Sequence, residues 1–509
     1  MVKKKGKNIF LNGLLILAPI LIWLGTEFVA NRVTHRFDPL LVDHDKGTLY
    51  INQEYFDDFF LYDLDEFLTT SSSNRAIRLQ KGNRFRIFSY GGSTTAGYPY
   101  NTFPAFECPS SFPNYLRVIL QYNPSVGNIE MLNLGCNALN SLHVLSLFKE
   151  TIQYDPDLAI IYCGHNEYFG PNEFTVPKDK TLFYQNPDTF PLYMKIRRTY
   201  LYQGLRKFIG NFTDRFEKKH QDYFQWARQN AITANDPLHD KVETNYRRNI
   251  EEIIRLARQN KIPLVLCTPI ANVTFPPFIA KYEKQFTEGE MAKLDSLDNL
   301  GREHYNNEEY EDSIDYFSRL KQADSTFADA WYHTGMTYVR MKAYKKAANE
   351  LYQAKDYDAL PFRAKSFIYN VLYQTANRHK VPLAELEPFF TSISQKYYPA
   401  PSQLIDHVHP TDSGYYYAAL FLSRFLVENG FFPGVEQLRF PDLESCRRVL
   451  GIEESTVDRI EYEFPEGSFF DRLSRLNPEI AKYLNFIKKR AEQRVEKRKL
   501  DTAAEEIFK

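Results

Sequence analysis

Residues 85–97 read Phe85-Arg86-Ile87-Phe88-Ser89-Tyr90-Gly91-Gly92-Ser93-Thr94-Thr95-Ala96-Gly97, an apolar run that passes directly into a turn of small residues. The apolar run predicts a buried strand, and the glycines allow the sharp turn that follows it. In an open parallel sheet, ligands bind in the crevice outside the carboxyl ends of the strands. We therefore expect Ser93 to point into that crevice as a candidate nucleophile. The alternative is an ordinary turn hydroxyl, because serine is a common turn residue.

Three further apolar runs, at 129–134, 158–163 and 263–267, predict strands that are separated by helical segments. The segment 244–258 has apolar residues at helical spacing and leads into the last of these strands, so we expect a crossover helix there. Strands that are joined by helical crossovers pair in parallel. The sequence therefore predicts an α/β core with a mostly parallel sheet.

The composition is that of a globular protein, with 43% hydrophobic and 25% charged residues. A chain of 509 residues is too long for one ordinary core, so we expect several domains. Lys and Arg number 63 and Asp and Glu number 64, which leaves a net charge of −1 and no overall field to attract nucleic acid. The cysteines lack CxxC spacing, and we interpret them as small core residues: Cys108, Cys136, Cys163, Cys267 and Cys446.

The N-terminus carries a targeting signal. A lysine cluster at 3–7 precedes a nearly unbroken apolar stretch at 9–26, which as a helix would span roughly 27 Å, about one hydrocarbon core. We expect 1–30 to form a single transmembrane anchor with the lysines inside, so that the rest of the chain lies outside the cytoplasmic membrane, periplasmic or extracytoplasmic. A cleaved signal peptide and a buried amphipathic helix are the alternatives.

The core itself is expected to be divided between 81–284 and 376–434, with a lead-in segment at 31–80. An aromatic and basic stretch at 171–240 follows the third predicted strand on the crevice side, and it is predicted to be an inserted cap or an interdomain packing surface. The extension at 435–509 interleaves Glu with Lys and Arg at i, i+4 spacing. This pattern predicts a solvated helix, with attraction to anionic lipid as the alternative.

A second insertion, at 285–375, contains an internal repeat. A shift of 34 positions pairs Tyr310 with Tyr344 and Phe317 with Leu351. The second copy resembles the tetratricopeptide pattern, in which stacked helix pairs leave a concave groove. We expect a helical repeat module that either binds a protein partner in this groove or braces the core.

Polar motifs follow the predicted strands and recur near the end of the core: Asn133-Leu134-Gly135-Cys136-Asn137-Ala138, Gly164-His165-Asn166-Glu167 and Asp406-His407-Val408-His409-Pro410. All of them can converge on Ser93 at the carboxyl edge of the sheet. A serine needs a base, so His409 is expected to take its proton while Asp406 orients the imidazole. The developing oxyanion needs donors, and the candidates are the Ser93 N–H, a backbone N–H after the second strand and the Asn166 amide.

Purely structural roles are the alternatives for these residues. Asn166 is then a hydrogen-bonding residue at a loop end, and Asp406 caps a helix that begins near 410–412. Spacing disfavours His407 and His165 as the base.

These four motifs, in this order, resemble the SGNH family of GDSL-type esterases. The family's Gly-Asp-Ser-x-x-x-Gly is met at 91–97, with Gly92 in place of the aspartate. The family's oxyanion glycine corresponds to Ala138, whose N–H keeps that role if the backbone adopts the required angles, and Gly135 is the alternative donor. The family's Gly-x-Asn-Asp is met at 164–167 and its Asp-x-x-His at 406–409.

The resemblance covers about 81–175, 243–275 and 400–425, and it implies a three-layer α/β/α, flavodoxin-like fold. It also implies a serine hydrolase of acyl esters, with acetyl esters the first expectation. The alternatives are an O-acyltransferase that modifies a surface polysaccharide, and a repeat-mediated scaffold with a vestigial esterase core. No cofactor and no metal are expected, because no His/Asp/Glu cluster at ligand spacing is apparent.

Overall fold

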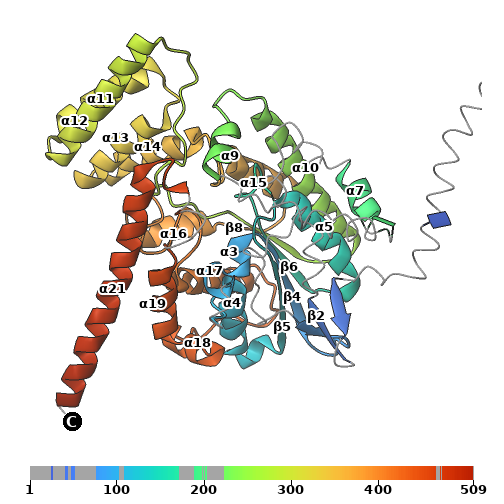
Figure 1. Cartoon of the computed structure of the whole chain (residues 1–509). Coiled ribbons are helices and arrows are strands. Elements are labelled where there is room, and N and C mark those ends of the chain that lie inside the picture. The colour runs from blue at the N-terminus through green and yellow to red at the C-terminus, as the bar shows by residue number, and fades with distance from the viewer. Residues whose placement is uncertain are drawn as a thin grey trace, which may run out of the picture.

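A computed structural model describes residues 25–26, 40–43, 47–51, 76–102, 108–170, 189–197, 199, 201–202, 223–465, 471 and 473–507. Its centre is a parallel five-stranded sheet (Figure 1). The strands are β4 (Phe85–Gly91), β5 (Ile129–Gly135), β6 (Leu158–Tyr162), β7 (Leu264–Cys267) and β8 (Leu383–Ala384). The predicted α/β class with a parallel sheet is confirmed.

The strands lie in the order β5-β4-β6-β7-β8. This is the 2-1-3-4-5 order of flavodoxin-like sheets, in which the switch point lies beside the first strand. The four predicted strands are all present. The fifth, β8, was not predicted, because only Leu383 and Ala384 pair with β7 and two residues carry no periodic signal.

Helices cover both faces of the sheet, which gives three layers (Figure 1). One face carries α5 (Ser141–Thr151), α10 (Leu238–Gln259) and α15 (Ser366–His379). The other face carries α4 (Phe112–Gln121), α16 (Leu386–Ser394) and α17 (Asp412–Glu428). Neighbouring residues of β4 alternate between the two cores, since Phe88 belongs to the first and Ile87 to the second.

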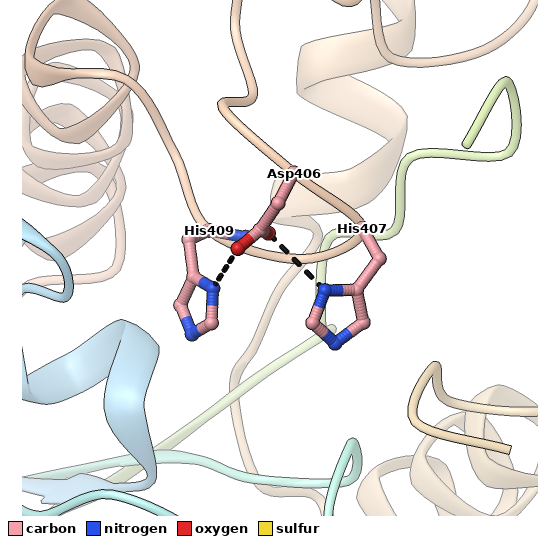
Figure 2. Close-up of side chains that lie close together, drawn as sticks. All are labelled: Asp406, His407 and His409. Carbon is pink, nitrogen blue, oxygen red and sulfur yellow. Dashed lines mark hydrogen bonds and ion pairs between the residues drawn. The ribbon is translucent and has the colours of Figure 1, made fainter. Parts of the chain in front are cut away.

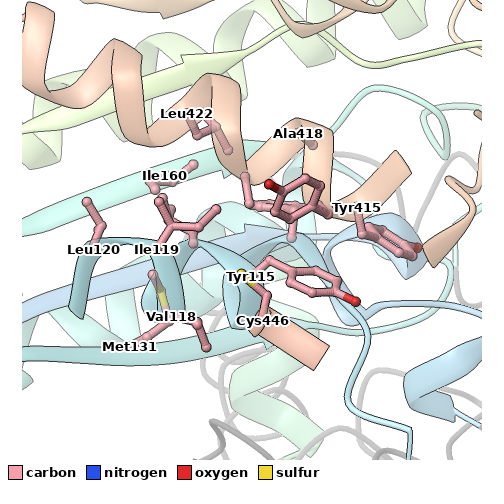
Figure 3. Packing of buried hydrophobic residues seen from close by; sticks show 14 of the residues in the cluster. Tyr115, Val118, Ile119, Leu120, Met131, Ile160, Tyr415, Ala418, Leu422 and Cys446 are labelled. Atoms are coloured by element: carbon pink, nitrogen blue, oxygen red, sulfur yellow. The ribbon is translucent and has the colours of Figure 1, made fainter. Parts of the chain in front are cut away.

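The second core is tightly interdigitated. Figure 3 shows Ile119 of α4 and Leu422 of α17 meeting Ile160 of the sheet, and all three side chains are fully buried. Burial of such side chains stabilises the fold by about 1.5–3 kcal/mol each. This core holds α4 and α17 in fixed positions beside the carboxyl ends of the strands.

The crossover helix α10 begins at Leu238, so it is longer than the helix predicted at 244–258. Its buried residues recur at helical spacing and face the first core: Tyr246, Ile250, Ile253, Ile254 and Ala257. Short 3₁₀ turns cover Tyr100–Thr102, Pro124–Val126 and Ile152–Tyr154. All five cysteines are buried with free thiols, as the sequence predicts.

The lead-in segment contributes a small antiparallel sheet of β1 (Leu41–Asp43), β2 (Thr48–Ile51) and β3 (Ala76–Arg78). No strands were predicted here, because elements of three or four residues are too short to show alternation. Leu49 and Ile77 belong to the first core. The described part of the segment therefore packs against the central domain.

Four helices occupy the predicted repeat region: α11 (Glu288–Asn306), α12 (Tyr310–Ala323), α13 (Ala328–Arg340) and α14 (Tyr344–Tyr357). They pack as two hairpins, α11 on α12 and α13 on α14 (Figure 1). The crossing is repeated: a Cβ on Gly301 would lie 2.9 Å from Phe317, and a Cβ on Gly335 would lie 2.7 Å from Leu351. Glycine at these positions lets each helix pair approach closely. A protein partner in a groove of this module remains a prediction.

The C-terminal extension forms α18 (Leu443–Leu450), α19 (Glu454–Glu463) and α21 (Pro478–Ile507). The solvated helix predicted here is wrong for the first half of α21, where apolar side chains are buried. Farther along, α21 packs against α19 (Figure 1). A buried stripe lies within its charged sequence, formed by Ile480, Leu484, Ile487 and Ala491. Some of the charges that suggested solvation pair with α19 instead, as in the 2.8 Å contact between Arg494 and Asp458.

The predicted anchor stretch at 9–26 lies almost wholly outside the described residues. Among the residues that are described, no helix combines the length and apolar character needed to cross a bilayer. The predicted cap at 171–240 is described only in part, including α7 (Phe190–Arg197) and α9 (Tyr223–Gln229). Its role as a cap remains a prediction.

Candidate active site

Ser93 stands where the first strand of the large sheet ends. Strand β4 stops at Gly91, and the short helix α3 (Ser93–Ala96) begins after Gly92. As the first residue of that helix, Ser93 has a backbone N–H without an intrahelical acceptor. Its side chain is half-buried, whereas Thr94, Thr95 and Ala96 are buried. Of residues 93–96, Ser93 is thus the one that is partly exposed.

His409 lies beside Ser93, with its Nε2 atom 2.6 Å from the Ser93 Oγ atom. Its other ring nitrogen, Nδ1, is 2.6 Å from Oδ2 of Asp406 (Figure 2). A proton on Nδ1 is then held by the carboxylate, which leaves the Nε2 lone pair to accept the serine proton. The structure therefore brings Ser93, His409 and Asp406 into one hydrogen-bonded chain across more than 300 residues of sequence.

Asp406 is fully buried, and among the described residues its carboxylate accepts hydrogen bonds from its own loop. Its Oδ1 atom accepts the backbone N–H groups of Val408 at 2.9 Å and His409 at 2.8 Å. Burial raises the pKa of this carboxyl, but the nearby imidazoles of His409 and His407 outweigh burial, so the pKa lies well below its ordinary value. Asp406 is therefore ionised at neutral pH and can stabilise an imidazolium at His409.

The alternative role of Asp406 as a helix cap is excluded. Helix α17 begins at Asp412, and its N-cap is Thr411, whose hydroxyl accepts the Gly414 N–H at 3.1 Å. Helix capping therefore does not account for Asp406.

Ala138 lies in the turn that joins β5 to α5, with a backbone φ of 61°. Few residues other than glycine adopt this left-handed conformation, which explains why the related motif has glycine there. No hydrogen bond among the described residues uses the Ala138 N–H. Ala138 thus adopts the backbone angles of a glycine and keeps its N–H available.

Asn166 follows β6 and reaches the same turn. Its Nδ2 atom donates to the Leu139 carbonyl at 3.1 Å, which leaves the second amide hydrogen for another acceptor. The place of a Cβ atom on Gly92 would be 2.6 Å from Asn166 Nδ2 and 3.3 Å from the Leu139 oxygen. The Asn166 amide and the Leu139 carbonyl therefore both lie beside Gly92, the residue that precedes Ser93.

Gly135, the alternative oxyanion donor, is wrong in that role. Its N–H donates to the Asn133 side-chain oxygen at 2.9 Å, so it is already committed. The structure gives this glycine a packing reason instead, because a Cβ there would lie 2.3 Å from the backbone nitrogen of Ala96. The absence of a side chain lets α3 rest on the end of β5.

Glu167 holds the same turn from the other side. The carboxylate is 7% exposed and accepts both the N–H of Ser141 at 3.0 Å and its hydroxyl at 2.6 Å. The Ser141 hydroxyl in turn accepts from Asn249 of α10 at 3.0 Å. Adjacent residues of one loop, Asn166 and Glu167, therefore both hold the turn that carries Ala138.

The contacts of two residues, Tyr98 and Asn272, were not anticipated from sequence. The ring of Tyr98 packs on the His409 imidazole with centroids 4.6 Å apart. Asn272, after β7, donates its amide to the Asp406 carbonyl at 2.8 Å and to the Tyr483 hydroxyl of α21 at 2.7 Å. Tyr98 follows the serine turn closely in sequence, so a place near the site could have been predicted for it. No local pattern connects Asn272 to Asp406.

The other two histidines of the motifs are buried. His165 accepts the Ala364 N–H at its Nδ1 atom at 3.2 Å, and burial holds its pKa well below the ordinary value. Burial likewise lowers the pKa of His407 to about 4, although Asp406 raises it in part. Both are neutral at physiological pH, and within the described residues the imidazole that contacts the Ser93 hydroxyl is that of His409.

The loop 406–409 also brings ligand-type atoms of Asp406, His407 and His409 within 4.8 Å of one another. The expectation that no His/Asp/Glu cluster at ligand spacing exists is therefore wrong for this loop. Both nitrogens of His409 are already engaged, one with Asp406 and one with Ser93. His409 would have to give up one of these contacts to bind a metal ion.

The chain matches no protein-family model, and no curated protein matches it by sequence. Its structure is similar to that of a GDSL-like lipase from Bacteroides thetaiotaomicron, with 12% identity, 69% of this chain and 89% of the other covered, and a TM-score of 0.29. It is also similar to an acetylxylan esterase from Geobacillus stearothermophilus, with 11% identity, coverage of 71% and 99%, and a TM-score of 0.30. For the acetyl xylan esterase AlAXEase the identity is 10%, the coverage 66% and 97%, and the TM-score 0.29. The functional assignment therefore depends on the geometry of the site.

Proposed function

We propose that the protein is a serine hydrolase of acyl esters, with Ser93 as nucleophile, His409 as general base and acid, and Asp406 as the group that orients His409. The observation that carries this proposal is the continuous chain from Ser93 Oγ to His409 Nε2 and from His409 Nδ1 to Asp406, with 2.6 Å at both steps. A serine hydroxyl is a weak nucleophile until a base removes its proton. This arrangement supplies the base and holds it in the required tautomer.

In the first half of the reaction, Ser93 Oγ attacks the ester carbonyl carbon while its proton moves to His409 Nε2. The tetrahedral intermediate then expels the alcohol, which takes that proton from His409, and an acyl-Ser93 ester remains. In the second half, a water molecule gives a proton to His409 and attacks the acyl carbon. The carboxylic acid leaves, and the proton returns to Ser93.

The negative charge on the carbonyl oxygen is proposed to be held by the Ser93 N–H, the Ala138 N–H and the Asn166 amide. Support comes from the position of Ser93 at the start of α3, from the φ of Ala138, and from the second amide hydrogen of Asn166. Removing one such donor typically lowers kcat by a factor of about 10² to 10³.

The test is hydrolysis of a short p-nitrophenyl ester, beginning with the acetate, by the full chain and by Ser93→Ala. The variant is expected to lose turnover and labelling by a fluorophosphonate probe. Ser89→Ala is the matched control, because Ser89 is buried in β4, the strand that leads to Ser93, and contacts Met131. Equal turnover by the wild type and Ser93→Ala would contradict the proposal. Acylated glycans can then be supplied as substrates, with product analysis to show whether the acyl group goes to water or to a sugar.

We also propose that 9–26 anchors the chain in the cytoplasmic membrane with the core outside. The support is the sequence alone, an apolar stretch that follows a lysine cluster. The full chain is expected in the membrane fraction after alkaline carbonate extraction, with the core open to protease added from outside. Recovery in the soluble fraction would contradict the anchor.

A further inference from the structure

The carboxylate of Asp406 lies between two imidazoles (Figure 2). His409 contacts its Oδ2 atom, and Nδ1 of His407 lies 3.3 Å from its Oδ1 atom. The two rings are nearly perpendicular, with centroids 5.6 Å apart. The proposed mechanism uses His409 and gives His407 no role.

The ring of His407 is fixed by aromatic side chains from two neighbouring segments. Phe275 and Phe278, after β7, lie with their ring centroids 5.7 Å and 5.3 Å away, and Phe362 lies 6.3 Å away. The His407 carbonyl accepts the Asn272 N–H at 2.9 Å. Ring and backbone are therefore both held, which keeps the Nδ1 atom 3.3 Å from Oδ1 of Asp406, close to it but without the alignment of a hydrogen bond in this structure.

We propose that His407 is a positioning residue for the Asp406 carboxylate: from 3.3 Å away, a small rotation of the ring lets its Nδ1–H donate to Oδ1 of Asp406, and this contact sets both the orientation and the basicity of that carboxylate. This inference rests on the proposed function of Ser93, His409 and Asp406. Because burial lowers the pKa of His407 to about 4, the ring is neutral at working pH and has one N–H to donate.

The consequence for catalysis follows because His407 and His409 both contact the same carboxylate. A carboxylate that accepts one more hydrogen bond has less negative charge available on its oxygens. It therefore attracts the imidazolium of His409 less strongly. Loss of the His407 donor makes the carboxylate more basic, so His409 keeps its proton up to a higher pH. Since the base must be unprotonated to act, the acid limb of kcat/KM then moves to higher pH.

The other ionisable groups around this pair stay in one form in the relevant range. His165 is neutral, because burial holds its pKa well below the ordinary value. Burial raises the pKa of Tyr98 and of Tyr483, so both phenols keep their protons. Arg363 is paired with Asp358 at 3.1 Å. A shift of the acid limb can therefore be assigned to the pair formed by Asp406 and His409.

Two substitutions separate the donor from the ring. His407→Asn places an amide N–H near the former Nδ1 position, whereas His407→Phe keeps an aromatic ring among the phenylalanines and has no donor. We expect His407→Phe to move the acid limb up by about half a pH unit or more and to lower kcat about tenfold. His407→Asn is expected to keep the wild-type acid limb, with kcat within about threefold.

The readouts distinguish this inference from the proposed function. The wild type must first be shown to hydrolyse the ester and Ser93→Ala to fail to do so. If the wild type and Ser93→Ala do not differ in this way, the proposed function is contradicted. The protonation of His409, followed by NMR of ¹⁵N-labelled histidine in the wild type and His407→Phe, reads the effect of His407 without turnover. Equal titration and equal pH profiles in folded wild type, His407→Phe and His407→Asn would overturn the inference. If His407→Phe does not fold, His407→Leu takes its place as the variant without a donor.

Discussion

Gly92 and Asn166 are coupled by the lack of a side chain at position 92. The Cβ position of Gly92 would lie 2.6 Å from Asn166 Nδ2, too close for any real contact. Position 92 is also where the chain departs from the GDSL motif, which has aspartate there. The amide of Asn166 thus occupies space that a side chain at position 92 would otherwise fill.

Substitution of Gly92 by alanine is therefore expected to impair catalysis and leave the fold intact. The nearest atom is the end of the Asn166 side chain, which can rotate away at little cost to stability. Rotation removes an oxyanion donor, so we expect kcat to fall by about 10² to 10³, with the melting temperature nearly unchanged. Steady-state ester hydrolysis and a thermal melt of the same preparation measure the two effects.

A double-mutant cycle tests the cause. In the Asn166→Ala background, Gly92→Ala is expected to cost little more, because the group that it displaces is already gone. Gly289→Ala in α11 is the matched control, since a Cβ there meets nothing within 4 Å. Fully additive losses in the cycle would show that Gly92 acts independently of Asn166.

Replacement of Asp406 by asparagine is expected to abolish most activity through the tautomer of His409. The two backbone N–H groups of Val408 and His409 both point at Oδ1, so the amide oxygen of an asparagine will face them. The amide NH₂ then faces His409 Nδ1, which forces the ring proton onto Nε2. A protonated Nε2 atom cannot accept the proton of Ser93. We expect kcat to fall by about 10² to 10⁴, with a parallel loss in the rate of fluorophosphonate labelling. Retained labelling at the wild-type rate would contradict this role of Asp406.

Glu167→Gln is expected to loosen the turn that carries Ala138. Glu167 accepts two donors of Ser141, whereas a glutamine offers one oxygen and one NH₂ group. We expect kcat to fall about tenfold with KM within about twofold, because the turn acts on the transition state. Ser141→Ala keeps the backbone N–H contact with Glu167 and should lose less. An increase in KM without a change in kcat would instead assign Glu167 to substrate binding.

The sequence predicts the parts of this molecule that depend on short-range patterns. Strands β4, β5, β6 and β7 are apolar runs, and Ser93 follows the first of them directly, so its place at the strand end could be foreseen. The structure also brings Asp406 and His409 to it, as their spacing suggested.

The parts that could not be predicted depend on contacts between distant segments. The Gly135 N–H donates to the side-chain oxygen of Asn133, and that contact depends on the direction of one side chain near the end of β5. Asn272 supports Asp406 from more than 130 positions away, without any local signal. The buried half of α21 was missed because its apolar stripe is narrow and most of its residues are charged.

His333 in α13 offers a test of how the helical hairpins respond to acid. The ring is buried and stacked on Phe317 with centroids 5.1 Å apart, and its Nε2 atom has no hydrogen-bond partner within the described part of the chain. Burial holds the pKa of His333 well below the ordinary value of about 6.5. The unfolded chain thus binds a proton below pH 6.5 that the folded chain excludes, so the free energy of unfolding falls as the pH decreases, by about 1.4 kcal/mol per pH unit for this residue.

His333→Phe keeps the stack on Phe317 and removes the titrating group. We expect the variant to be as stable as the wild type at pH 7 and more stable at pH 5, with ester hydrolysis unchanged. Urea unfolding followed by circular dichroism at both pH values measures the difference. The wild type also buries neutral His143, whose pKa burial lowers to about 3, so both proteins lose stability in acid and the variant loses less. An equal loss in the two proteins would show that His333 takes up its proton without unfolding.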